Sequence, residues 1–171
     1  MAESSTASTT DQFVDRLDDF GVSSTVIDPE AVETEIEAVA ATPTVGVDPG
    51  IEGVSLPESV DRDISPATVE AAATGVTGAV LGVADYGSIV IPTTRSGVEP
   101  VALFADQHVA VIQESAIVPD MGAALSALGD RFRDDDWSGI IATGPSATAD
   151  MGALVTGAHG PKTVHVLVVR S

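Results

Sequence analysis

The residues best able to do chemistry lie together near the carboxyl terminus, in the stretch TGPSATADMGALVTGAHGPK between 143 and 162. Hydroxyl, carboxylate and imidazole side chains stand there among glycines that allow a ligand close to the backbone. Two chemistries would use them: a nucleophilic triad of Ser146, Asp150 and His159, or a cradle of N–H groups and hydroxyls for a small anion. Because the serine lacks the Gly-x-Ser-x-Gly elbow, the pattern favours a cradle or a structural turn over the triad.

The segments on either side of this stretch indicate how it would be positioned. SGIIAT, at 138–143, predicts a buried strand, and GPS predicts a turn. We expect Thr143 or Ser146 to cap a short helix that begins near Ala147, with an anion held at the amino end of that helix. The candidate ligand-binding residues of the stretch are Thr143, Gly144, Ser146, Thr148, Asp150, Gly157, His159 and Gly160.

Two further candidates lie upstream. Asp85 follows an apolar run in a tight turn, and Arg95 lies in the polar loop PTTRSG. Asp85 could equally be an ordinary turn residue, and Arg95 an ordinary solvent-exposed side chain. Arg95 is nevertheless one of few cations, which makes it a suitable partner for an anionic ligand. His108 and His165 fall within apolar runs and indicate core or edge positions, since three dispersed histidines give no zinc spacing.

The order of apolar runs predicts an α/β fold. We expect strands at 24–28, 44–48, 108–113, 138–143 and 163–170, and two more on either side of the turn at 85–87. Helices are expected to begin at Thr10, Pro29, Ser65 and Pro119, where capping residues or prolines stand. This alternation predicts a mainly parallel sheet covered on both faces. Residues 1–9 are expected to form a flexible polar tail, and 10–171 a single domain.

The composition restricts the classes of partner. Asp and Glu number 26 against 7 Lys and Arg, which gives a net charge of −19 and repels nucleic acid. Hydrophobic residues make up 44% of the chain, which predicts a folded protein rather than a disordered one. We interpret the negative charge as an adaptation to the salty cytoplasm of a halophilic archaeon. No cysteine is present, so these residues hold no iron–sulfur cluster. With no signal-like segment and no apolar run long enough to span a bilayer, we expect a cytoplasmic protein.

The segments IIATGPSATAD and LVTGAHGPKTVHVLVV are similar to the carboxyl-terminal signature of LUD-domain proteins, in the lactate-utilisation protein C group. Upstream, GVADYGSIVI and HVAVI resemble a turn and a strand of the same family, and the resemblance covers residues 70–171 well. The sequence departs from the family at Ala147, where an arginine is usual, and at Asp85-Tyr86, where the family has Glu-Thr.

The resemblance implies a Rossmann-like three-layer fold, similar to sugar-phosphate isomerases and coenzyme A transferases. It also implies an accessory role in the oxidation of L-lactate to pyruvate. Partner subunits would carry the iron–sulfur clusters, and this chain would bind a small carboxylate or phosphate without a cofactor of its own. Two alternatives stay open: a stand-alone isomerase- or acyl-transferase-like enzyme for a phosphorylated or thioester substrate, and a regulatory or structural module.

Overall fold

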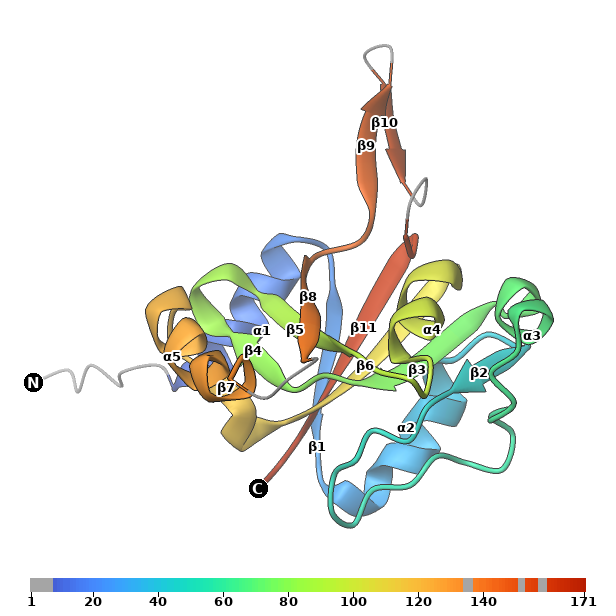
Figure 1. Ribbon diagram of the computed structural model, residues 1–171, viewed down its shortest axis with the longest axis horizontal. Coiled ribbons are helices and arrows are strands. Elements are labelled where there is room, and N and C mark those ends of the chain that lie inside the picture. The colour runs from blue at the N-terminus through green and yellow to red at the C-terminus, as the bar shows by residue number, and fades with distance from the viewer. Residues whose placement is uncertain (1–7, 134–136, 151–152, 157–159) are drawn as a thin grey trace, which may run out of the picture.

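The computed structural model describes residues 8–133, 137–150, 153–156 and 160–171 (Figure 1), and of 148–150 and 153–156 it describes only the backbone. Five strands form an all-parallel sheet in the order β1-β11-β6-β3-β2. Their bounds are Ser23–Ile27 for β1, Thr44–Gly46 for β2, Thr74–Gly78 for β3, Gln107–Gln113 for β6 and Thr163–Val169 for β11. The central strands β6 and β11 are apolar on both faces, as strands buried on both sides must be.

Different elements cover the two faces of this sheet. Val109 and Val111 of β6 share a core with helix α2 (Val32–Val39), which follows the 3-10 turn η1 (Pro29–Ala31). The alternate residues Ala110 and Ile112 share a second core with helix α1 (Thr9–Asp19) and helix α4 (Val98–Phe104). This division follows from the two-residue period of a strand.

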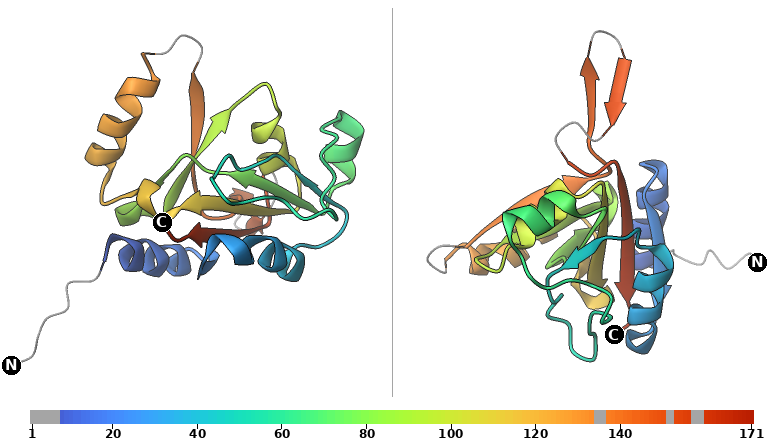
Figure 2. Two further views of the ribbon diagram at one scale, coloured as in Figure 1. Left: turned by 90° about the horizontal axis from the view of Figure 1, so that it is seen from below. Right: turned by 90° about the vertical axis from the view of Figure 1, so that its right-hand side faces the viewer.

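A second, mixed sheet lies beside the parallel sheet (Figure 2). Its order is β7-β4-β5-β8, with β4 and β8 antiparallel to β5. The bounds are Leu81–Val83 for β4, Ser88–Thr93 for β5, Ile117–Val118 for β7 and Ser138–Thr143 for β8. Helix α5 (Met121–Arg131) packs Ala124 and Leu128 against this sheet. The sheet is also joined to the first core, because Ile89 and Ile91 of β5 lie in it.

The remaining elements are helix α3 (Pro66–Ala71), the 3-10 turns η2 (Ala84–Tyr86) and η3 (Glu114–Ala116), and a hairpin. The hairpin pairs β9 (Ala147–Asp150) with β10 (Ala153–Thr156) and stands out from the body of the molecule (Figure 1). None of the helices in the described part of the chain is long and apolar enough to cross a membrane.

The predicted parallel sheet is confirmed, and so are the two strands around the turn at 85–87. The second sheet was not predicted. The helix expected from near Ala147 is wrong, because that residue begins strand β9. Ser146 does not cap a helix there. Its amide donates to the carbonyl of Pro161, and the chain then continues into a hairpin.

Helix starts differ from the expectations by one or two residues. Ser8 caps α1 and forms a capping box with Asp11, so the helix begins at Thr9 rather than after a Thr10 cap. Asp120 caps α5, directly after the proline that was expected to open it. The start at Ser65 is confirmed, because its side chain accepts from the amide of Thr68.

Candidate functional site

Four of the predicted residues line one cavity of about 230 Å³. Thr143 ends strand β8, Gly144 and Ser146 follow in the turn, and Gly160 precedes strand β11. The opposite wall is apolar and comes from β5, α4 and β11. The cavity therefore lies between the mixed sheet and the amino ends of β6 and β11, since His108 and Val164 are the second residues of those strands.

The turn at Ser146 is closed against the entry to β11. The Ser146 amide donates to the Pro161 carbonyl at 2.8 Å. A Cβ atom on Gly160 would lie 3.1 Å from the Ser146 Cβ, which is tight packing. Ser146 and Gly160 therefore pack closely against each other. The Ser146 amide, however, is engaged within the protein and is not a donor for a ligand.

Two hydroxyl groups meet at the edge of the cavity. Ser88 of β5 and Thr143 of β8 are directly opposite in the antiparallel register, and their Oγ atoms are 2.6 Å apart. One hydroxyl hydrogen joins the two side chains, so the other is available to a second acceptor. Because Thr143 lines the cavity, this pair can donate one hydrogen bond to a ligand there.

His108 is the functional candidate that the sequence analysis did not select. Its side chain is buried, lines the same cavity, and lies 2.9 Å from the Thr77 hydroxyl through Nε2. Burial removes the water that would solvate the cation and lowers the pKa of His108 to about 4. The imidazole is therefore neutral at neutral pH. The sequence signal for His108 was an imidazole side chain near the start of the mainly apolar strand β6.

Of the other predicted residues, Asp85 and Arg95 do not line this cavity. The Asp85 carboxylate accepts from Gln12, and its carbonyl accepts from Arg16 Nε at 3.0 Å, so Asp85 ties η2 to α1. Arg95 lines a different cavity. The backbone of Thr148 and Asp150 belongs to β9, in the hairpin that stands away from the body. Gly157 and His159 lie outside the described residues.

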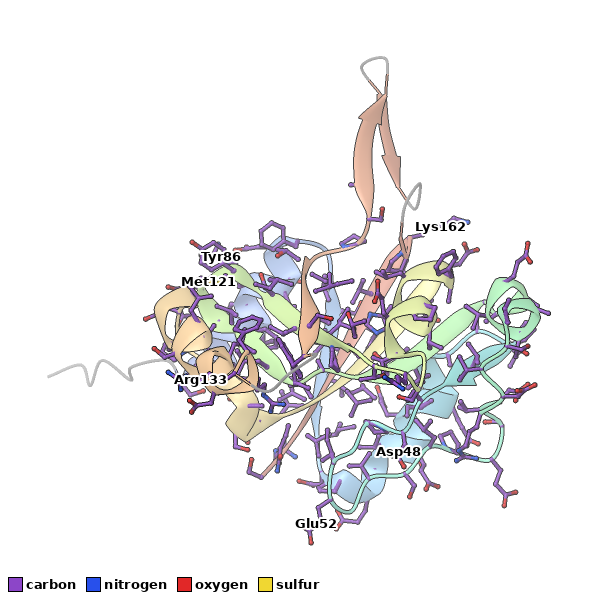
Figure 3. The ribbon with its side chains drawn as sticks, viewed as in Figure 1. Asp48, Glu52, Tyr86, Met121, Arg133 and Lys162 are labelled. Carbon is purple, nitrogen blue, oxygen red and sulfur yellow. The ribbon has the colours of Figure 1, made fainter. Side chains whose placement is uncertain are left out.

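The lone lysine is also directed elsewhere. Lys162 lies beside the base of the hairpin (Figure 3), and its ammonium pairs with Asp106 at 2.8 Å. Both side chains are more than half exposed, so the pair is a surface contact. A phosphate in the cavity would thus receive no direct contribution from Lys162.

The chemistry available in the cavity is hydrogen bonding in apolar surroundings. None of the described lining residues is Asp, Glu, Lys or Arg; the polar side chains are two hydroxyls and the neutral His108. Within the described ranges, no group of three His, Asp or Glu side chains could hold a metal ion. Doubly charged ligands are disfavoured in such a site, because their desolvation is not offset by a cation.

The fold and cavity define a protein of the α/β class with a parallel five-stranded sheet, a second mixed sheet and a small cavity that has no charged residue in its described lining. Residues 15–169 match the model of the LUD domain, and the chain belongs to the LUD domain family.

Two similar proteins are both named lactate utilization protein C. Lactate utilization protein C of Deinococcus radiodurans is 28% identical over 169 residues, which cover 92% of this chain and 78% of that protein. Lactate utilization protein C of Bacillus licheniformis is 32% identical over 107 residues, 58% of this chain and 43% of that protein. The chain thus matches less than half the length of the Bacillus protein.

A solved structure shares the fold. The crystal structure of a DUF162 family protein from Deinococcus radiodurans superposes with a TM-score of 0.70 and 24% sequence identity. The superposition covers 96% of this chain and 99% of that one, so the two proteins share the same overall fold.

Proposed function

We propose that this chain is an accessory subunit in the oxidation of L-lactate to pyruvate and that its cavity binds the small monocarboxylate. The cavity carries the proposal: its walls are apolar, its polar side chains are hydroxyls and a neutral imidazole, and its described lining holds no charge. The relatives named lactate utilization protein C support the same process.

The chemistry of lactate and pyruvate matches these walls. Each has a methyl group, which suits the side chains of Ile89 and Val164, and oxygens that accept or donate hydrogen bonds. A single carboxylate can accept hydrogen bonds from the side chains of Ser146, Thr143 and His108, which offset part of its desolvation cost. A phosphate ester carries more charge and would need a cation, which the described lining does not supply.

This reasoning favours binding over catalysis by the isolated chain. A histidine whose pKa is about 4 is a weak base at neutral pH, so His108 does not abstract protons efficiently. The Rossmann-like, sugar-phosphate isomerase- and coenzyme A transferase-like architecture remains the basis of the alternative, a stand-alone enzyme for a phosphorylated or thioester substrate. Likeness of fold alone is weak support for that alternative.

The redox step is assigned to partner subunits. These residues contain no cysteine, and oxidation of lactate removes two electrons that need an acceptor. We therefore place iron–sulfur clusters in the partners and no cofactor in this chain. The net charge of −19 fits the cytoplasm of a halophilic archaeon and argues against a nucleic-acid partner.

Ligand titration followed by NMR tests the cavity. L-Lactate and pyruvate are expected to shift the resonances of His108 and Ser146, whereas inorganic phosphate and coenzyme A are not. Ser146→Ala removes a hydrogen bond and is expected to weaken lactate binding by up to about tenfold. Ser115→Ala, at an exposed residue of η3, is the matched control. Binding of phosphate or coenzyme A but not of lactate would support the enzyme alternative.

Reconstitution tests the role. The chain is expected to co-purify with cysteine-rich proteins encoded by neighbouring genes and to raise their rate of lactate oxidation. If it neither associates with them nor changes the rate, the accessory role is wrong. Lactate binding by the isolated chain would then stand as a separate result.

A further inference from the structure

A second cavity, of about 490 Å³, lies between α3 and α4. It shares no described lining residue with the first cavity. Its walls are mainly apolar and include Ile64, Val69, Pro100 and Phe104. Val69 belongs to a buried core cluster, and Ile64 packs against that cluster. The floor of this cavity is therefore part of the folded interior rather than a gap between loose segments.

Phe104 is an apolar side chain that the fold leaves in water. It is 74% exposed, more than any other large hydrophobic residue in the described ranges. The sequence has only four phenylalanines, and this one lies on the rim of the larger cavity. An apolar ligand in the cavity would remove both the walls and this ring from water, which is the main driving force for such binding.

Arg95 supplies a positive charge at the same cavity. Its loop is ordered by contacts of its own: the Thr94 and Ser96 hydroxyls are 2.8 Å apart, and the Gly97 amide donates to the Thr94 carbonyl. Gly97 has φ +84°, and a Cβ atom there would lie 2.6 Å from Cγ2 of Ile64. The glycine therefore allows the loop to pack directly on the cavity wall, with the exposed Arg95 two residues before it.

Positively charged side chains are few in this chain, and Arg95 is one of them. Of seven lysines and arginines, Arg16, Arg133, Lys162 and Arg170 each pair with an aspartate. Arg62, Arg95 and Arg131 are in none of the ion pairs found among the described residues, and of these three only Arg95 lines the second cavity. A guanidinium beside apolar walls is the arrangement that binds a carboxylate attached to an apolar body.

We propose that the cavity between α3 and α4 binds an organic monoanion with an apolar body, whose acid group pairs with Arg95 and whose chain covers Phe104. Glu70 also lines this cavity, and its carboxylate disfavours a second negative group on the ligand. A medium-chain carboxylate meets these conditions. A phosphate ion does not, because it would leave the apolar walls in water.

Octanoate and 1-octanol are the probes, because they share the chain and differ in charge. Both are titrated at one fixed salt concentration, since the net charge of −19 repels anions in a salt-dependent way. Octanoate is expected to shift resonances of Ile64, Val69 and Phe104. Arg95→Gln is expected to weaken octanoate binding by at least about tenfold and to leave octanol binding unchanged.

Arg131→Gln, which removes the same charge from the last turn of α5, is the matched control and is expected to bind octanoate as the parent does. Phe104→Ser is expected to weaken both probes. Equal effects of the two arginine substitutions, or no octanoate binding below about 10 mM, would overturn the proposal. Shifts confined to the first cavity would overturn it as well. Lactate binding, measured in the same variants, should not respond to Arg95→Gln, so failure here is distinguishable from failure of the proposed function.

Discussion

The buried imidazole of His108 makes the stability of this protein depend on pH. Burial lowers its pKa to about 4, from 6.5 for the exposed group. The unfolded chain therefore takes up a proton near pH 6.5, and the folded chain takes one up only near pH 4. Between these values, acidification favours the unfolded state by about 1.4 kcal/mol per pH unit. The stabilisation is complete above the unfolded pKa, and its loss, about 3 kcal/mol in all, is complete below the folded pKa.

Comparison with His108→Gln isolates this effect. The glutamine is polar and can still reach the Thr77 hydroxyl, which the imidazole contacts at 2.9 Å, but it does not titrate. The free energy of unfolding is measured with urea between about pH 7 and about pH 4. Carboxylates and the other histidines titrate in both proteins, so the difference between the curves reports His108. The parent is expected to lose about 3 kcal/mol more than the variant.

Parallel pH curves for the two proteins would refute this reasoning. An NMR titration of the parent gives a second test that does not depend on the folding of the variant. The ring signals of His108 should indicate a neutral imidazole until the pH approaches 4. A midpoint near the ordinary value for histidine would show that the ring is solvated and that the first cavity is open to bulk water.

Three further predictions concern stability and are checked by urea or thermal unfolding. Gly75→Ala should destabilise by more than about 2 kcal/mol, since the new Cβ would lie 2.0 Å from the Val101 carbonyl oxygen. Gly129→Ala, in α5 with nothing within 4 Å, should stabilise by about 0.5–1 kcal/mol; equal effects of the two would contradict the packing. Ser88→Ala should cost about 1 kcal/mol by removing the bond to Thr143, and Thr143→Ala should add little to it. Raising KCl from about 0.1 M to about 2 M should raise Tm by several degrees by screening the charge of −19, and a fall in Tm would count against a halophilic source.

The elements that the sequence predicted correctly are those with strong local signals. Strands β6 and β11 are apolar runs, and α3 begins at a serine followed by proline. The pairing of β8 with β5 could not be predicted in this way, because the choice between a parallel and an antiparallel neighbour depends on residues far apart in the chain, such as Ser88 and Thr143. A helix was predicted near Ala147 because Thr143 or Ser146 could cap one, but the segment pairs with β10 as strand β9, a pairing that no local capping signal could reveal.

In the candidate site, too, local features could be predicted from the sequence and features that depend on distant residues could not. Thr143, Gly144 and Ser146 meet because they are neighbours in the chain, and Gly160 joins them where the chain returns. His108 could not be assigned to the site, because its place there depends on the packing of β6 against other strands. Arg95 was grouped with these residues by charge alone. Its loop lies instead at the second cavity, where the absence of a Cβ on Gly97 leaves room for Ile64.

Helix α4 separates the two cavities, which explains how one small domain can offer two different binding environments. Ala102 and Leu103 line the first cavity, whereas Pro100 and Phe104 line the second. The helix is held close to the sheet because Gly75 has no Cβ to keep the Val101 carbonyl away. The first cavity is smaller and has no charge in its described lining, so we expect it to select a short ligand by hydrogen bonds. The second is larger and has Arg95 at its wall, so we expect an apolar chain and a single negative charge both to contribute to binding there.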